Sequence, residues 1–164
     1  MIMMNIDLEG LDGSGKSTQA KLLSEYYRLK EARVRLLHFP TVDDEYIGRV
    51  VKHYLGGKYG SALETNPEVM AMVYATDRKM ISSKMYTWAT YKYVLVLDRY
   101  VESNCAYQGA KLDSIDDRLE FRHWVRSFEY EFYKSPKPDL AFYLDVPLDI
   151  IEKRLKETRE PWSW

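Results

Sequence analysis

The sequence contains one cysteine, Cys105, and neither sign of charge predominates. A single cysteine excludes an internal disulfide and a cysteine-based zinc site. The formal net charge of −1, without any basic block, gives no support for an extended nucleic-acid surface. No apolar run approaches the ~20 residues that span a bilayer, and the opening M-I-M-M-N does not resemble a signal peptide. We therefore expect no nucleic-acid or membrane partner and a cytoplasmic location, with the nucleus as the alternative.

Apolar residues, by contrast, are abundant. They make up 46% of the 164 residues, and 14% of the chain is aromatic. This composition can build a substantial hydrophobic core, and the length suits one domain rather than two. Repeats and low-complexity tracts are absent. We therefore expect a single domain over residues 1–164.

Residues 10–18 read G-L-D-G-S-G-K-S-T, a complete phosphate-binding loop. Its glycines allow the backbone to turn tightly and to aim N–H groups at the α- and β-phosphates of a nucleoside triphosphate. Lys16 is expected to reach the β- and γ-phosphates, and Ser17 to bind magnesium. The motif follows a strand-like stretch and precedes a helical pattern, which is the context that it requires. The alternative, a chance glycine-rich turn, does not explain that context.

Strand and helix patterns alternate along the rest of the chain. Short apolar runs predict strands at 6–8, 34–39, 93–97 and 140–144. Helical spacing and end signals predict helices at 16–30, 46–55, 67–91, 114–132 and 148–157. Asn66 is expected to cap the third helix, with Pro67 at its first position, and Ser114 and Asp117 resemble a capping box.

This order predicts an α/β fold, a three-layer sandwich with a mainly parallel central sheet flanked by helices. A ligand is expected at the carboxyl ends of the strands. Asn5 and Asp7 are unusual in a central strand, so they need buried partners unless that strand is exposed. Asp98 and Arg99 follow the buried strand 93–97, where a carboxylate can hold magnesium and a guanidinium can bind phosphate. The alternative for this pair is an ordinary turn with a surface ion pair.

Five segments together resemble the thymidylate kinase family of P-loop nucleoside monophosphate kinases. They are E-G-L-D-G-S-G-K-S-T-Q, F-P at 39–40, D-R at 77–78, D-R-Y-V-E-S-N-C-A-Y-Q-G-A-K at 98–111, and P-K-P-D-L-A-F-Y-L-D-V at 136–146. The resemblance extends from about Met3 to Arg154. It implies transfer of the γ-phosphoryl group of ATP to dTMP, giving dTDP, with Mg²⁺ and as a homodimer.

The resemblance also implies site residues. The expected catalytic residues are Asp12, Lys16, Asp98, Arg99 and Arg159. ATP is expected to contact Gly10, Gly13, Ser14, Gly15, Lys16, Ser17, Thr18 and Arg154, and Ser17 and Asp98 are expected to bind the metal. The dTMP site is expected to contain Asp12, Phe39, Pro40, Tyr74, Arg78, Arg99, Ser103, Asn104, Tyr107 and Gln108. Tyr74 would stack on thymine and Arg78 would hydrogen-bond the base, a pairing that their i, i+4 spacing on one helix favours independently.

Three features depart from the family pattern. Val42 stands where members often carry an arginine for the acceptor phosphate, and Arg49 is a candidate substitute. Gly13 follows the loop aspartate where some members have a catalytic arginine, which favours a lid over about 152–164 with Arg159 as its arginine. The family fold usually continues through a further strand and helix, so the chain is expected to be short at its C-terminus.

Other functions remain open at this point. A deoxynucleoside kinase would phosphorylate thymidine, although its acidic-arginine pair usually begins with Glu, where this chain has Asp98. A truncated nucleotide-binding protein with weak catalysis is the non-enzymatic alternative. A regulatory GTPase is disfavoured, because no Asn-Lys-x-Asp motif occurs. The apolar positions at 46–55 and on the helix from Pro67 could form a dimer face, but burial in the monomer explains the same pattern.

Overall fold

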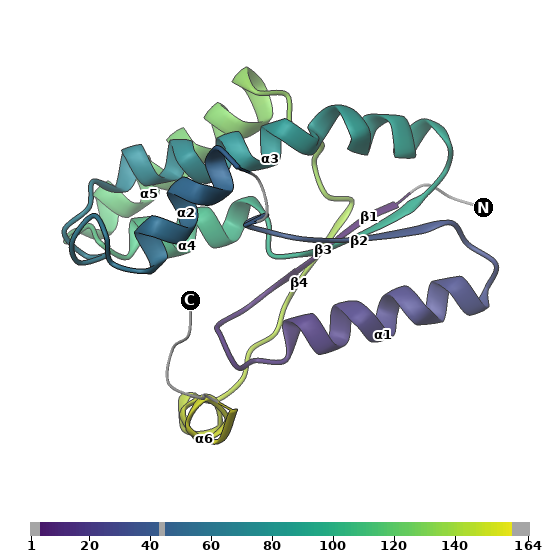
Figure 1. The fold of residues 1–164 in the computed structure, drawn as a ribbon, viewed down its shortest axis with the longest axis horizontal. Coiled ribbons are helices and arrows are strands. Elements are labelled where there is room, and N and C mark those ends of the chain that lie inside the picture. The colour runs from purple at the N-terminus through teal and green to yellow at the C-terminus, as the bar shows by residue number, and fades with distance from the viewer. Residues whose placement is uncertain (1–3, 43–44, 159–164) are drawn as a thin grey trace. The chain divides into compact units, whose positions relative to one another are not determined.

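A parallel sheet forms the framework of the computed structural model, which describes residues 4–42 and 45–158. The sheet has four strands in the order β2-β3-β1-β4, and every neighbouring pair is parallel (Figure 1). The strands are β1 (Met4–Glu9), β2 (Val34–His38), β3 (Val94–Asp98) and β4 (Leu140–Tyr143). All four predicted strands are therefore present, and the α/β class with a mainly parallel sheet is confirmed.

The central strands are buried, as the apolar run in β3 predicts. All five residues of β3 are buried, and the first four are apolar, as expected for a strand with a neighbour on each side. β1 is buried too, although it carries Asn5 and Asp7. Asn5 exchanges two hydrogen bonds with Asp139: its N–H donates to Oδ2 at 2.7 Å, and its carbonyl accepts from the Asp139 N–H at 2.9 Å. The structure thus shows β1 as a buried strand with partners, and not as an exposed strand.

Helix α1 (Lys16–Leu29) covers one face of the sheet. Ala20 packs in a cluster with Ile6 and Leu8 of β1 and Val94 and Val96 of β3. These alternate positions on each strand point to the same face, which matches the period of two in the sequence. The other helix associated with the sheet is α6 (Leu148–Thr158).

The remaining helices form a second compact unit, to which most of α3 belongs. They are α2 (Ile47–Leu55), α3 (Pro67–Thr90), α4 (Val101–Gly109), α5 (Ile115–Ser127) and the π-helical segment η1 (Phe128–Phe132). None of the helices in the described chain is long and apolar enough to cross a membrane. The expectation of one domain over 1–164 stays a prediction.

Both predicted helix starts are confirmed. Oδ1 of Asn66 accepts a hydrogen bond from the Val69 N–H at 3.0 Å, and α3 begins at Pro67. Oγ of Ser114 accepts from the Asp117 N–H at 3.0 Å and donates to the Asp117 carboxylate at 2.6 Å. These side chains satisfy N–H groups that have no partner within the first helical turn.

Two features of the second unit were not predicted. α4 follows the D-R-Y segment directly, where the sequence analysis placed no helix. The helix predicted over 114–132 changes at Phe128 from α-helical to π-helical winding. Such π segments occur often at functional sites, because the extra residue per turn redirects the side chains.

Candidate active site

The loop between β1 and α1 is shaped by glycines. Gly10 and Gly13 have φ values of +146° and +79°, which disfavour other residues. A Cβ on Gly10 would lie 2.9 Å from Ser14 Oγ and 3.0 Å from the carbonyl oxygen of Leu144. A Cβ on Gly13 would lie 3.2 Å from Cγ of Leu155 in α6. Glycine therefore allows both the turn and the close packing of α6 on the loop.

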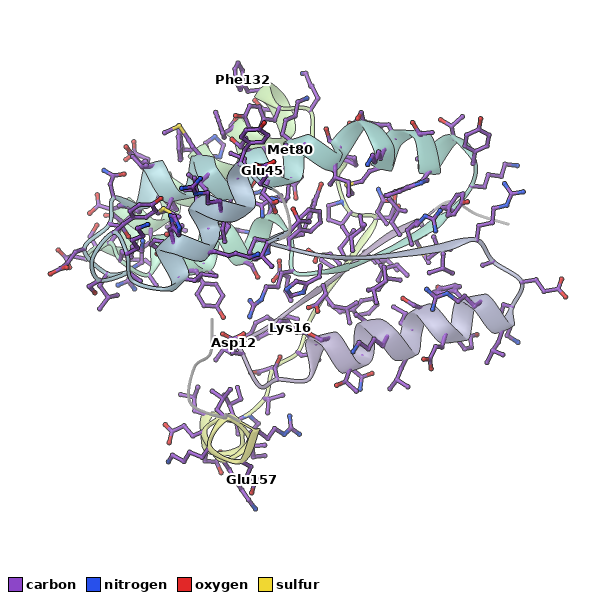
Figure 2. All side chains as sticks on the ribbon, in the orientation of Figure 1. Asp12, Lys16, Glu45, Met80, Phe132 and Glu157 are labelled. Atoms are coloured by element: carbon purple, nitrogen blue, oxygen red, sulfur yellow. The ribbon has the colours of Figure 1, made fainter. Side chains whose placement is uncertain are left out.

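Lys16 lies at the first position of α1, where the loop ends, and Figure 2 shows it with Asp12 at that end of the helix. It is only 5% exposed, and its Nζ donates a hydrogen bond to the Leu11 carbonyl at 2.7 Å. Burial and the nearby charge of Arg99 lower the pKa of Lys16, while the carboxylate of Asp12 opposes that shift. A phosphate at this nitrogen would stabilise the ammonium, because an opposite charge favours the charged form.

Asp98 ends β3 beside the loop. Its Oδ2 lies 3.0 Å from Nδ1 of His38, at the end of the neighbouring strand β2. Burial by itself would raise the pKa of Asp98, but hydrogen bonds from His38 and Ser17, together with the charge of Lys16, hold it below its usual value. Oδ1 is buried and has no hydrogen-bond partner among the described residues. The site thus contains a carboxylate that is held in its charged form and has one oxygen without a hydrogen-bond donor.

Arg99 turns back over the phosphate-binding loop. Its φ is +68°, an uncommon conformation for a residue with a side chain. Its N–H donates to the Leu8 carbonyl at 3.1 Å, and its guanidinium pairs with Asp12 and donates to the Gly10 carbonyl at 3.4 Å. Strained backbone of this kind is concentrated at functional sites, where it aims a side chain.

A cavity of about 530 Å³ lies over the loop. Arg154 of α6 reaches it and donates from Nη1 to the Gly13 and Ser14 carbonyls at 3.1 and 3.4 Å. The residues around the cavity are Asp12, Gly13, Ser14, Gly15, Lys16, Ser17, Thr18, Gln19, His38, Arg99 and Arg154. The structure therefore gathers almost all of the predicted ATP-binding residues, with Gly10 at the base of the same loop. Sequence analysis missed His38, although its place at the end of a strand was a usable signal.

The residues predicted for the acceptor belong to the second compact unit, except Asp12 and Arg99. Tyr74 is half-buried on α3, and its ring lies 6.3 Å from the ring of Tyr54 at an angle of 79°. The ring of Phe39 is buried 5.6 Å from that of Tyr100, and the peptide bond between Phe39 and Pro40 is cis. On α4, Ser103 is half-buried, Tyr107 is exposed, and Asn104 and Gln108 are buried.

Arg78, the predicted base-binding residue, is buried in an ion pair that the sequence analysis did not predict. Its Nε donates to Oε2 of Glu129 at 2.7 Å, and its Nη2 donates to Oε1. The side chains are 3% and 0% exposed, respectively. Burial opposes the charge of Arg78, but Glu129 raises its pKa above the ordinary value. The sequence did hold a signal, since Phe121, Val125 and Glu129 follow each other at i, i+4 spacing and place an acid in an apolar stripe.

Asn104 joins the same network. Its Nδ2 donates to Oε1 of Glu129 at 3.2 Å and to the Ala71 carbonyl at 3.0 Å. Its Oδ1 is buried and has no hydrogen-bond partner among the described residues, and the same holds for Oε1 of Gln108. Buried acceptors without partners are uncommon in folded proteins, so these two oxygens are candidates for contact with a ligand.

The structure describes the Val42 position and the first part of the predicted lid, up to residue 158. Next to Val42, Thr41 donates its N–H to Oδ2 of Asp77 at 2.9 Å, and its hydroxyl donates to Oδ1. Arg49, the candidate substitute for the missing arginine, is exposed on α2. Arg159 and the end of the predicted lid lie outside the described residues.

Known proteins resemble this chain over most of its length. A family model described as thymidylate kinase matches residues 8–162. A protein of Pyrococcus abyssi called probable thymidylate kinase is 36% identical over 151 residues, which are 91% of this chain and 68% of that protein. A thymidylate kinase of Mycobacterium tuberculosis is 31% identical over 151 residues, or 92% of this chain and 70% of that protein.

A solved structure agrees with the sequence comparisons. The structure of thymidylate kinase from Candida albicans matches with a TM-score of 0.73 at 27% sequence identity. The match covers 99% of this chain and 69% of the other. The similarity therefore includes both the sheet with its phosphate-binding loop and the helices that carry the predicted acceptor residues.

Proposed function

The chain belongs to the thymidylate kinase family, and we propose that it transfers the γ-phosphoryl group of ATP to dTMP, giving dTDP and ADP. One structural observation carries most weight: Lys16 and Arg99 line the cavity over the phosphate-binding loop, and Asp98 lies behind them, bonded to the lining residue His38. Phosphoryl transfer requires positioning and charge neutralisation more than covalent chemistry by the protein. These residues supply both.

The ATP side of the reaction uses the loop and the start of α1. Backbone N–H groups from Gly13 to Thr18 are proposed to hold the α- and β-phosphates, assisted by the positive end of the helix dipole. Lys16 and Arg99 neutralise charge on the β- and γ-phosphates. Arg154, which already contacts the loop carbonyls, is proposed to flank the adenine.

The residues at the end of β3 fit a magnesium ion. Mg²⁺ is usually bound by one or two carboxylates, with phosphates and waters completing its coordination. Among the described residues, no group of three His, Cys, Asp or Glu side chains could hold a metal by itself. The buried, ionised Asp98 with its available Oδ1 and the neighbouring Ser17 hydroxyl match this sparse arrangement. The ion would neutralise phosphate charge during transfer.

The acceptor side uses the helices of the second unit. Tyr74 is proposed to stack on thymine, and Arg78 and Asn104 to hydrogen-bond the base. The side chains of Phe39, Pro40, Ser103, Tyr107 and Gln108 complete the nucleoside site. Asp12 is proposed to contact the sugar 3′-hydroxyl or support the phosphates, and Arg99 to contact the acceptor phosphate.

The proposed function also includes a homodimer and a lid. Leu55 of α2 and Val69, Met72 and Met80 of α3 are exposed apolar residues that fit a homodimer face. Sedimentation at micromolar concentration should show particles heavier than the 19.4 kDa monomer. A lid over about 152–164 with Arg159, and residence in the cytoplasm, also belong to the proposed function.

The decisive assay measures ADP formation from ATP and Mg²⁺ with dTMP, with thymidine, and without acceptor. Turnover with dTMP alone is expected. Turnover with thymidine alone would overturn the proposal and favour a deoxynucleoside kinase. ATP binding without turnover would indicate a nucleotide-binding protein with weak catalysis. The Lys16→Ala variant is the control for a contaminating kinase.

A further inference from the structure

Glu129 is a buried carboxylate to which the proposed reaction assigns no role. It lies on η1 with a side chain that is 0% exposed. It joins Arg78 of α3 and Asn104 of α4, two residues proposed to contact the acceptor base. Burying a charged group is costly unless it is paired, so this position calls for an explanation.

The hydrogen bonds of Glu129 orient Arg78 and help to orient Asn104. A carboxylate only accepts hydrogen bonds. Nε and Nη2 of Arg78 therefore both turn toward Glu129, as a guanidinium does in a two-point pair. The Asn104 amide must likewise direct Nδ2 to Glu129, at 3.2 Å, so its Oδ1 faces away from the carboxylate. The Ala71 carbonyl, which accepts from Nδ2 at 3.0 Å, holds the amide in the same orientation.

Two polar atoms of this network remain for a ligand. No hydrogen bond from Nη1 of Arg78 occurs within the described residues. Oδ1 of Asn104 is buried and also has no partner there. Nη2 of Arg78 and Nδ2 of Asn104 both donate to Oε1 of Glu129. The guanidinium that carries Nη1 and the amide that carries Oδ1 therefore share one acceptor atom. The network therefore offers a ligand one donor and one acceptor.

This pair complements a pyrimidine with an oxygen at position 4. Thymine presents the O4 acceptor beside the N3–H donor, whereas cytosine presents a 4-amino donor beside the N3 acceptor. A site that offers a donor to O4 and an acceptor to N3–H fits thymine. With cytosine, the same site sets donor against donor and acceptor against acceptor, and such mispairing strongly reduces turnover. We propose that Glu129 is a positioning residue that orients Arg78, beside Asn104, for 4-oxopyrimidines and against 4-aminopyrimidines. This inference rests on the proposed function of the acceptor site.

The test compares kcat/KM for dTMP and dCMP in the wild-type protein and in Glu129→Gln, with KM for ATP measured in parallel. Glutamine keeps the shape of the side chain but replaces one acceptor oxygen with an N–H donor, so the two-point pair that orients Arg78 is lost. The ratio of kcat/KM for dTMP to that for dCMP should fall at least about tenfold, through a higher KM for dTMP. KM for ATP should change less than about twofold. Glu131→Gln, an exposed position on the same segment, is the matched control and should leave the ratio unchanged.

A second variant keeps the test valid if Glu129→Gln does not fold. Glu129→Asp retains the charge but is one methylene shorter, so it cannot keep all three hydrogen bonds, and the same fall in the ratio is expected. An unchanged ratio in a folded variant would overturn the role of Glu129 while leaving the proposed kinase activity intact. Equal kcat/KM for dTMP and dCMP in the wild-type protein would overturn the role of Glu129, irrespective of the results with the variants. Absence of wild-type turnover with dTMP would overturn both proposals.

Discussion

The buried pair of Arg78 and Glu129 makes a stability prediction that can be worked out from its burial. Removing one member leaves the other as an unpaired buried charge, which typically costs about 3–5 kcal/mol. We expect Glu129→Leu to fall near the upper end, because arginine cannot lose its proton. Arg78→Met should fall near the lower end, because the carboxyl of Glu129 can take up a proton instead. The double variant should be more stable than either single variant, since replacing a buried pair by apolar groups is often nearly neutral.

Thermal unfolding followed by circular dichroism measures these effects. A loss of 1 kcal/mol lowers Tm by roughly 2–4 °C at this chain length. Arg78→Met should therefore lower Tm by about 6–12 °C and Glu129→Leu by about 10–20 °C. The control is Glu102→Gln, which breaks a more exposed pair with Arg126 and should cost at most about 1 kcal/mol. A double variant that loses the sum of the two single losses would refute the reasoning.

Three further substitutions address the loop and the helix that carries Tyr74. Lys16→Ala should lower kcat about 100-fold or more by removing charge stabilisation of the phosphates. It should not lower Tm, because burial and the charge of Arg99 disfavour the ammonium group of Lys16 and lower its pKa. Near-normal turnover would contradict the loop assignment. Gly13→Ala should destabilise the protein by about 1–2 kcal/mol through the positive φ at this position and weaken ATP binding in a fluorescence titration. Adding Leu155→Ala should restore little of that stability. Full recovery would show that the contact of the new methyl group with Leu155, and not the backbone conformation, causes the loss. Asn66→Ala should destabilise the protein by about 1 kcal/mol in urea unfolding, whereas Asn66→Ser should retain most of that stability, and equal losses would argue against the cap.

The parts of the fold that were predicted depend on local patterns. The continuous apolar run before Asp98 identified a buried parallel strand, because only such a strand is apolar on both faces. The caps at Asn66 and Ser114 were found because each satisfies N–H groups within three residues of itself. The phosphate-binding loop is likewise a local motif, so its residues could be placed around one cavity before the structure was known.

The parts that were missed depend on partners distant in the chain. Glu129 lies 51 positions after Arg78, and only the packing of η1 beside α3 makes its carboxylate a buried partner rather than a surface charge. His38 is 60 positions from Asp98, and the register of β2 against β3 brings the two together. Sequence spacing reports the face of an element on which a residue lies, but not what packs against that face.

Two of the arginines proposed to contact nucleotides, Arg99 and Arg78, differ in the charge around them, and this difference fits the tasks proposed for them. Arg99 lies near Lys16, and the repulsion between them helps to lower the pKa of Lys16. Phosphate groups relieve that repulsion, so this cavity favours anions. Arg78 is already neutralised by Glu129, which holds two of its nitrogens. An arginine whose charge is paired acts mainly as an oriented hydrogen-bond donor, which suits the neutral edge of a base. In the proposed site, Glu129 thus makes Arg78 suited to distinguishing bases rather than to binding phosphate.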